Sequence, residues 1–385
     1  MESLHKPRVL LLIHSLVFAG AERVVVDMAK ELDVAGYKVA ICVFAEVEGL
    51  AAELDHSRIS LYVVQKKRRF DFVLLFRLIS LLRRFKPHVL SMHCRDALHF
   101  GAPAALIAGV PIRIATEHSV GPGTNQFLNR LAFGLSSPTL SATVAVSEFL
   151  KRFMVQKWGF RPERIKVIHN GVDFARLGSG HNPGGLRREL GLSPGTRIVG
   201  NAGRLGKEKG HDQFLEIASK VACQDSLVHF VLIGNGPALD RLKALAAELG
   251  LADRVHFMAA RLDAPSVVTE FDVFLCTSQI ETFGLAVVEA MYLGVPVVAF
   301  DVGSLNEIIT DGVNGFLVSH GDIEAASGRV LSLLGDPVLR GVITKSALET
   351  VEGRFSVQKM TRAYEELFGV KGRELESTNV QRLPL

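Results

Sequence analysis

The sequence predicts an α/β protein built from two doubly wound parallel sheets, and three observations lead to this fold class. Short apolar runs, typical of the interior strands of a parallel sheet, recur at residues 9–13, 39–44, 89–92, 112–116 and 142–146. Amphipathic helical stretches such as 21–32 and 72–85 separate these runs, which indicates βαβ units. The pattern stops in a glycine-rich stretch at 178–185 and restarts with runs at 198–202, 229–233, 255–258, 273–276, 295–300 and 316–318.

This restart divides the chain into domains. We expect a first Rossmann-like domain over 1–177, a linker over 178–195 and a second Rossmann-like domain over 196–353. A helix over 354–370 is expected to pack back on the first domain, and a flexible tail covers 371–385. Ligands of such folds bind at the carboxyl ends of the strands, so we expect the two domains to face a central cleft that holds the site.

Composition excludes several classes of protein. The chain is 48% hydrophobic and 22% charged, which predicts a globular rather than a disordered protein. Its formal net charge of +4 is too small for a dedicated nucleic-acid-binding protein, and no nucleic-acid partner is expected. No apolar run reaches the roughly 18 residues that a membrane-spanning helix needs. The cysteines Cys42, Cys94, Cys223 and Cys276 are too widely spaced for a zinc site or a disulfide framework, so we expect reduced thiols in the core.

The first apolar run could belong to a signal peptide, because Lys6 and Arg8 precede it and small residues follow at 19–21. His14 interrupts that run, however, and a buried strand followed by a turn and a helix explains the same residues better. We therefore expect cytoplasmic residence.

Two common phosphate-binding motifs are absent from the sequence. The glycines Gly234 and Gly236 begin a dinucleotide fingerprint, but Leu239 stands where its third glycine should be. Gly206 and Lys207 are followed by a glutamate, which excludes a P-loop.

A different phosphate-binding loop is predicted at 203–210, after the first strand of the second half. It holds three glycines, among them Gly203, and three cations. Arg204 can bind phosphate oxygens with two nitrogens, and Lys209 can supply a point charge, so a diphosphate could be neutralised without a metal ion. A solvated basic turn at a helix start would show the same pattern.

A pair of carboxylates follows the strand at 273–276. Glu281 lies in the loop, Glu289 comes eight residues later, and a helix begins near Gly284 between them. The free amides of that helix start favour an anion, and Glu289 could accept hydrogen bonds from ribose hydroxyls. The alternative is that Glu289 simply points to solvent.

In order and spacing, these motifs resemble those of the family-four retaining glycosyltransferases with the GT-B architecture. The resemblance runs from Leu10 to about Phe368. It includes the sequences GAERV at 20–24, TEH at 116–118, VSE at 146–148, VIHNGVD at 167–173, GRL at 203–205, EKG at 208–210 and GNGP at 234–237. Its most specific element is the pair Glu281 and Glu289 around the TFG sequence at 282–284.

The resemblance implies an enzyme that moves a hexosyl or N-acetylhexosaminyl group, with retention, from a nucleotide-diphosphate sugar to a glycan or lipid-linked acceptor. A UDP-sugar is favoured over a GDP-sugar, and the pathway implied is cell-surface polysaccharide or lipopolysaccharide biosynthesis. No cofactor and no metal are expected, since the chain has no DxD motif. Two alternatives are a nucleotide-sugar epimerase or hydrolase of the same fold and a non-catalytic nucleotide-sugar sensor.

The resemblance also implies that the domain over 1–177 lies on the acceptor side and that the domain over 196–353 binds the nucleotide sugar. It further implies residue roles. Arg204 and Lys209 would stabilise the charge that develops on the diphosphate, Glu281 would face the donor sugar, and His118 would lie beside the reacting sugar. The catalytic set is therefore His118, Glu281, Arg204 and Lys209. The donor-binding set is Gly20, Gly203, Arg204, Lys209, Glu281, Thr282, Phe283, Gly284 and Glu289. A loop histidine is often only a solvated group. His93, at the end of another strand, is expected behind His118 or on the acceptor side.

A basic segment at 66–86 suggests a membrane surface as a further partner. It holds one acid and eight basic residues: Lys66, Lys67, Arg68, Arg69, Arg77, Arg83, Arg84 and Lys86. Apolar residues at 72–85 accompany them. This combination suits the surface of an anionic bilayer, so the protein could bind peripherally to the inner face of the cell membrane. An ordinary helix that covers the sheet and has a solvated cationic edge is the alternative.

Overall fold

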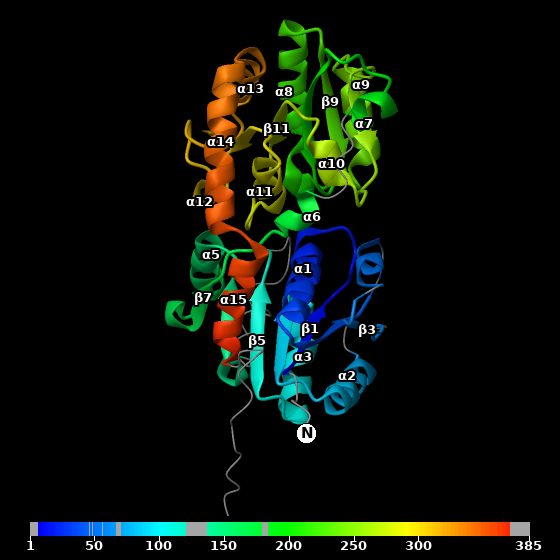
Figure 1. Cartoon of the computed structure of the whole chain (residues 1–385), viewed down its shortest axis with the longest axis vertical. Helices are drawn as coiled ribbons and strands as arrows, with labels where there is room; N and C mark the ends of the chain where they lie inside the picture. Colours follow the sequence, from blue (N-terminus) through cyan, green and yellow to red (C-terminus); the bar gives the residue numbers. More distant parts are fainter. Residues whose placement is uncertain are drawn as a thin grey trace, which may run out of the picture. The chain divides into compact units, whose positions relative to one another are not determined.

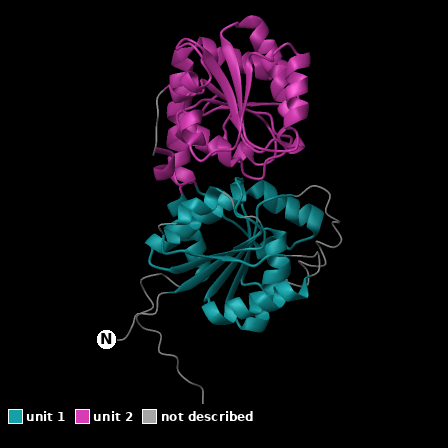
Figure 2. Ribbon diagram, turned by 90° about the vertical axis from the view of Figure 1, so that its right-hand side faces the viewer, with its two compact units in different colours: residues 1–171, 357–385 teal, residues 172–356 magenta. Residues whose placement is uncertain are grey.

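The structure is a computed structural model, and it describes residues 7–45, 47, 49–55, 57–66, 71–120, 137–178 and 184–369. The chain forms two compact units (Figure 2). Unit 1 comprises Met1–Gly171 and Val357–Leu385, and unit 2 comprises Val172–Ser356. In each unit helices cover both faces of a parallel sheet (Figures 1 and 2), which confirms the predicted fold class of two doubly wound sheets.

The sheet of unit 1 has the strand order β3-β2-β1-β4-β5-β6-β7, and all neighbours pair in parallel. Its strands are β1 (Arg8–Ile13), β2 (Lys38–Val43), β3 (Ser60–Val63), β4 (Val89–His93), β5 (Ile112–Glu117), β6 (Ala142–Ala145) and β7 (Ile165–Val167). The edge strands β3 and β7 were not predicted. They are short and partly exposed, so they carry no long apolar run.

The helices of unit 1 are α1 (Gly20–Val34), α2 (Phe72–Phe85), α3 (Arg95–Ala108), α5 (Glu148–Trp158) and α15 (Val357–Phe368). The apolar faces of α2 and α3 bury Leu10 and Leu12 of β1. The last helix, α15, returns to this unit from the far end of the chain, and Tyr364 of α15 forms a 3.0 Å hydrogen bond with Thr116 at the end of β5. Short 3₁₀ turns η1 (Gly49–Leu54), η2 (Ser137–Thr139) and η3 (Pro162–Arg164) complete the described part.

The sheet of unit 2 has the order β10-β9-β8-β11-β12-β13. Its strands are β8 (Arg197–Ala202), β9 (Val228–Ile233), β10 (Val255–Met258), β11 (Val273–Cys276), β12 (Val297–Phe300) and β13 (Phe316–Val318). The helical elements are α6 (Phe174–Gly178), α7 (Gly185–Glu189), η4 (Lys207–Lys209), α8 (His211–Gln224), α9 (Leu239–Glu248), α10 (Ala264–Val268), α11 (Leu285–Tyr292), α12 (Leu305–Ile308), α13 (Ile323–Gly335) and α14 (Pro337–Arg354).

Unit 2 begins earlier than the boundary that the sequence suggested. Residues 172–178 belong to it because Phe174 stacks on Tyr292 at a ring distance of 4.2 Å, and Arg176 pairs with Glu289. The described part of the expected linker is also anchored there, since the amide of Leu186 donates to Glu270 at 2.7 Å. The predicted tail at 371–385 lies outside the described residues.

The cysteines match the expectation of free thiols in the core at Cys42 and Cys276, which are buried. Cys94 is half-buried, whereas Cys223 is exposed, so for that residue the expected core position was wrong: it lies near the end of α8 on the polar face of the helix. In the part of the chain that the structure describes, no helix has the length and apolar character required to cross a bilayer.

Each sheet reverses its strand order at one place. In unit 1 the chain moves outward from β1 to β2 and β3, then returns to the other side of β1 with β4. In unit 2 the same reversal separates β8 from β11. Loops that leave such a pair of strands diverge above the sheet, and this divergence creates the ligand crevice of doubly wound folds.

Candidate functional site

In unit 2, the loops after β8 and β11 meet at this reversal. Lys209 Nζ donates to Glu281 Oε1 at 2.6 Å, and Ser278 Oγ donates to the same oxygen at 2.7 Å. Burial alone would lower the pKa of Lys209, but the Glu281 carboxylate outweighs that effect, and the pKa is raised. Lys209 therefore keeps its positive charge beside Glu281, as a phosphate-binding lysine requires.

Close backbone contacts fix the position of Glu281. Gly303 has φ +62°, and a Cβ atom there would lie 1.9 Å from the carbonyl oxygen of Glu281. The amide of Ser304 donates to that oxygen at 3.0 Å. The loop before it is held in the same way, since a Cβ on Gly210 would lie 2.1 Å from the Thr277 oxygen. Sequence analysis did not single out Gly303 or Ser304. The only local signal is a glycine shortly after an apolar strand.

The start of α11 has the predicted form. Gly284 adopts φ +89° at the N-cap, a conformation that favours glycine, and no side chain of the described residues caps the first turn. Thr282 is half-buried beside it, and Phe283 is buried against Phe355 at a ring distance of 5.5 Å, so the ring of Phe283 belongs to the core. Any ligand contact at Phe283 must therefore come from its backbone.

Glu289 lies in the second turn of α11 and is half-buried. It does not simply point to solvent, because Arg176 Nη2 donates to Glu289 Oε1 at 2.6 Å. Asp173 holds Arg176 in place by accepting its backbone amide at 3.3 Å. Sequence analysis missed Arg176, since nothing local distinguishes one arginine in a short helix 113 residues away.

The structure does not bring Arg204 to the same cluster. Its side chain is 62% exposed and pairs with Glu208 at 3.4 Å, and no described contact links it to Glu281 or Glu289. Gly203 lies under this loop, where a Cβ on Gly234 would come within 1.9 Å of its carbonyl oxygen. Close packing of the two loops thus depends on Gly234 more than on Gly203.

In unit 1, His118 follows β5 and is 7% exposed. Its Nε2 lies 3.0 Å from Nδ1 of His93, which is fully buried at the end of β4. Burial lowers the pKa of His118 to about 4 and raises the pKa of the neighbouring Glu117 to about 7. Gly20, the remaining predicted residue, is the first residue of α1.

A second polar cluster lies at the reversal of unit 1. Asp96, in the first turn of α3, lies 3.2 Å from His14 Nδ1 and accepts a hydrogen bond from Lys66 Nζ at 3.0 Å. The contact with His14 lowers the pKa of Asp96, and Lys66 adds to the shift. Lys66 also lies 5.1 Å above the ring of Phe100. Sequence analysis assigned Lys66 to a membrane surface, but its side chain is engaged here and only 19% exposed.

Two protein-family models match the chain: glycosyltransferase family 4 over 18–176 and glycosyl transferases group 1 over 185–350. The chain belongs to the family-four GT-B glycosyltransferases. The resemblance of its motifs is thereby confirmed, with most of the first match in unit 1 and all of the second in unit 2.

Relatives of this glycosyltransferase act on sugars. It is 25% identical over 308 residues, 77% of this chain and 79% of the relative, to the UDP-Gal:alpha-D-GlcNAc-diphosphoundecaprenol alpha-1,3-galactosyltransferase of Escherichia coli. It is 30% identical over 204 residues, 51% of this chain and 58% of the relative, to the lipopolysaccharide core biosynthesis mannosyltransferase LpsB of Rhizobium meliloti. The crystal structure of Anabaena HepE with UDP and glucose is similar at 26% identity and a TM-score of 0.83, over 95% of this chain and all of HepE.

The α2 surface of the glycosyltransferase is partly apolar and partly cationic. Phe72 and Phe76 are 75% and 70% exposed in its first turns. The last turns and the residue after them expose Arg83, Arg84 and Lys86. Lys67, Arg68 and Arg69 lie outside the described residues, so the cationic surface that the structure describes is that of α2.

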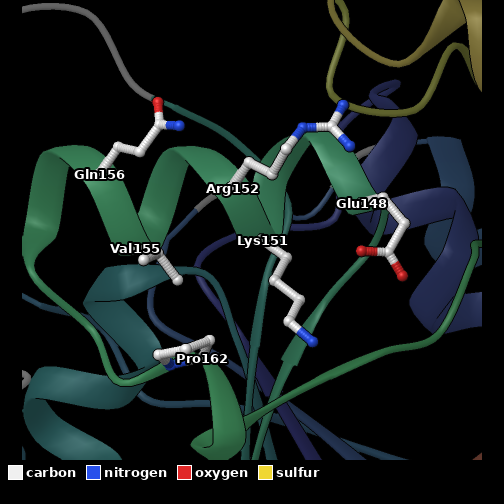
Figure 3. Close-up of a pocket in the computed structure, with 6 residues that line it drawn as sticks. All are labelled: Glu148, Lys151, Arg152, Val155, Gln156 and Pro162. Atoms are coloured by element: carbon white, nitrogen blue, oxygen red, sulfur yellow. The ribbon is translucent and has the colours of Figure 1, made fainter.

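A surface pocket lies elsewhere on unit 1, along α5. Figure 3 shows its lining, which is formed by Glu148, Lys151, Arg152, Val155, Gln156 and Pro162. None of the residues predicted to bind the nucleotide sugar or to act in catalysis lines this pocket, so the pocket is separate from the predicted site.

Proposed function

We propose that this glycosyltransferase moves a hexosyl or N-acetylhexosaminyl group from a UDP-sugar to a glycan or lipid-linked acceptor, with retention and without a metal ion. The observation that carries the proposal is the Lys209–Glu281 pair at the strand reversal of unit 2, beside the uncapped start of α11. UDP is favoured because the E. coli relative is named for UDP-Gal and HepE was crystallised with UDP and with UDP-glucose.

On the donor side, each group has a distinct task. Lys209 offsets the charge that builds up on the diphosphate as the glycosidic bond breaks, and the first amides of α11 donate to the same anion. Glu281 accepts hydrogen bonds from donor-sugar hydroxyls. Arg176 engages Oε1 of Glu289, so Oε2 is the oxygen that accepts from the ribose.

The way Glu281 is held favours one route to the retention that the family resemblance implies. Two donors, Lys209 and Ser278, already bind its Oε1, which makes it a poor nucleophile. We therefore favour attack by the acceptor on the same face that the diphosphate leaves, with the diphosphate oxygen receiving the acceptor's proton. The exposed guanidinium of Arg204 reaches the diphosphate only if its weak contact with Glu208 is exchanged for phosphate.

Unit 1 supplies the acceptor side in this proposal. His14 and Lys66 come from the loops after β1 and β3, Asp96 lies in the first turn of α3 after β4, and His118 follows the adjacent strand β5. A carboxylate held between the His14 imidazole and the Lys66 ammonium group, and still 41% exposed, suits the hydroxyls of a sugar acceptor. The α2 surface would hold the enzyme on anionic lipid when that acceptor is lipid-linked.

The test is release of UDP from UDP-glucose, UDP-galactose and UDP-N-acetylglucosamine, with and without a bacterial glycolipid extract, each in excess EDTA. Release that depends on the extract and persists in EDTA supports the proposal. Release without the extract indicates a hydrolase, conversion of the sugar without release indicates an epimerase, and binding without turnover indicates a sensor. Loss of activity in EDTA that Mg²⁺ restores would overturn the metal-free mechanism.

A further inference from the structure

A chain of three buried polar side chains leads from strand β4 to His118. Ser91 Oγ lies 3.0 Å from His93 Nε2, and His93 Nδ1 lies 3.0 Å from His118 Nε2. Ser91 and His93 point the same way because alternate residues of a strand share a face. His93 pairs with Thr116 across β4 and β5, so His118, two residues further, falls on that face too. The fold thus brings the three side chains together in a row.

Both imidazoles in the chain are neutral. Burial lowers the pKa of His118 to about 4 and lowers the pKa of His93 well below its ordinary value. A neutral imidazole carries a single N–H, so the row has two consistent proton arrangements. In the first, Ser91 donates to His93, and His93 Nδ1–H donates to His118 Nε2. In the second, His118 Nε2–H donates to His93, and His93 donates to Ser91.

In each arrangement one proton points out of the row: the hydroxyl proton of Ser91 in the second, and the proton on the buried Nδ1 of His118 in the first. The first is favoured because Ser91 lies inside the sheet with no exposure, whereas His118 follows the end of β5 and is 7% exposed. In the second, the hydroxyl proton of Ser91 needs a further acceptor, and within the described residues its Oγ meets only His93 Nε2. Ser91 is fully buried, so water does not supply that acceptor at its surface. A buried hydroxyl without an acceptor is unfavourable, whereas every polar atom of Ser91 and His93 is used when Ser91 donates. The ring proton of His118 then lies on Nδ1.

We propose that His93, oriented by Ser91, is a positioning residue that fixes the ring and the tautomer of His118, so that Nδ1–H is a hydrogen-bond donor for a sugar hydroxyl. The two rings lie 5.3 Å apart at 30°, an arrangement that resists rotation of His118. The contact of His118 with sugar rests on the proposed function. The tautomer rests only on the geometry of the row.

The experiment compares Ser91→Ala with Thr116→Val in protein labelled with ¹⁵N-histidine. Each variant removes one buried hydroxyl from the same face, but Thr116 binds Tyr364 and not the histidines. We expect the ¹⁵N spectrum to show His118 protonated on Nδ1 in the wild type and in Thr116→Val. In Ser91→Ala we expect its signals to shift towards mixed tautomers. His118→Gln assigns the signals.

Kinetics give the second readout. Partners that orient a functional histidine typically contribute about 10-fold to 100-fold, so Ser91→Ala should lower kcat by about tenfold. KM for the UDP-sugar should change less than about twofold, because orientation of His118 matters mainly as the sugar reacts. His93→Phe should lower kcat further. If His93→Phe does not fold, the kinetics of Ser91→Ala alone test the inference.

Two results would overturn the inference: His118 protonated on Nε2 in the wild type, or spectra and kcat of Ser91→Ala that match those of Thr116→Val. A wild type that transfers no sugar would refute the proposed function instead. The spectra would then still decide whether Ser91 and His93 set the tautomer.

Discussion

At the residue scale, the Lys209–Glu281 ion pair lets both charged side chains be largely buried in unit 2. Glu281 is 9% exposed, and a carboxylate so placed is unfavourable unless donors surround it. Lys209 and Ser278 supply those hydrogen bonds when no nucleotide sugar is bound. A bound diphosphate would draw on the same ammonium. Under the proposed function the pair would serve both stability and binding, so the two effects must be measured separately.

We predict that Lys209→Met lowers kcat by about a hundredfold to a thousandfold, because one preorganised donor to developing charge contributes about 2.7–4 kcal/mol. The free energy of unfolding should fall by about 1–3 kcal/mol, since Glu281 loses a partner. The matched control is Lys220→Met, which breaks the exposed pair of Lys220 and Glu324 in the same unit and should change stability by about 1 kcal/mol or less. Activity of Lys209→Met within threefold of the wild type would contradict its assigned role.

At the element scale, α2 shows how one helix serves two environments. Leu74, Leu78, Leu82 and Phe85 lie on the face that packs into unit 1. The other face exposes Phe72 and Phe76, and then the cations of the last turns. Exposed phenylalanines beside cations would suit the surface of an anionic bilayer, and a solvated helix edge is the alternative that the next experiment tests.

We predict that changing Arg77, Arg83 and Lys86 together to serine weakens binding to vesicles of anionic phospholipid by more than about a hundredfold, at about 1 kcal/mol for each cation. Co-sedimentation at low salt measures it, and binding of the wild type should fall as salt shortens the screening length from about 10 Å at 0.1 M to 3 Å at 1 M. A triple variant of Lys157, Lys243 and Lys345, exposed elsewhere, removes the same charge and should bind normally. Equal binding by both triple variants would show that α2 is only a solvated helix.

At the scale of the whole molecule, both units hold buried neutral histidines. Burial lowers the pKa of His118 in unit 1 and of His211 in unit 2 to about 4. The unfolded chain binds these protons from about pH 6.5 downward and the folded chain does not, so stability is lost as the pH falls from 6.5 towards 4. Glu117 acts in the opposite direction. Burial raises the pKa of Glu117 to about 7. Its contribution to the free energy of unfolding therefore falls as the pH rises from 4.5 to 7.

We predict that His211→Gln reduces the difference in unfolding free energy between pH 6.5 and pH 4.5 by about 2 kcal/mol. Lowering the pKa from 6.5 to about 4 is worth about 3.4 kcal/mol in all, and about 2 kcal/mol of this falls between those two pH values. Urea denaturation at both pH values measures the difference. His320→Gln, a change at an exposed histidine of the same unit, is the control. A difference in His211→Gln equal to that of the control would mean that folding does not lower the pKa of His211.

The sequence by itself determined the fold class, the family, and the order of the loops that carry Lys209, Glu281 and Gly284. These are local properties. The hydrophobic period, the length of a strand and the position of a glycine can each be read from a few neighbouring residues. The short edge strands β3 and β7 escaped prediction for the same reason: being partly exposed, they lack that local signal.

Only the tertiary structure decided which side chains meet. Arg176 reaches Glu289 from 113 residues away, and Tyr364 reaches Thr116 from 248 residues away. The Ser91–His93–His118 row exists because β4 and β5 lie in register, and Lys66 turned to Asp96 because the loops after β3 and β4 converge. Such contacts depend on strand order and helix docking, which are set by burial of the whole apolar surface and not by any single stretch of sequence.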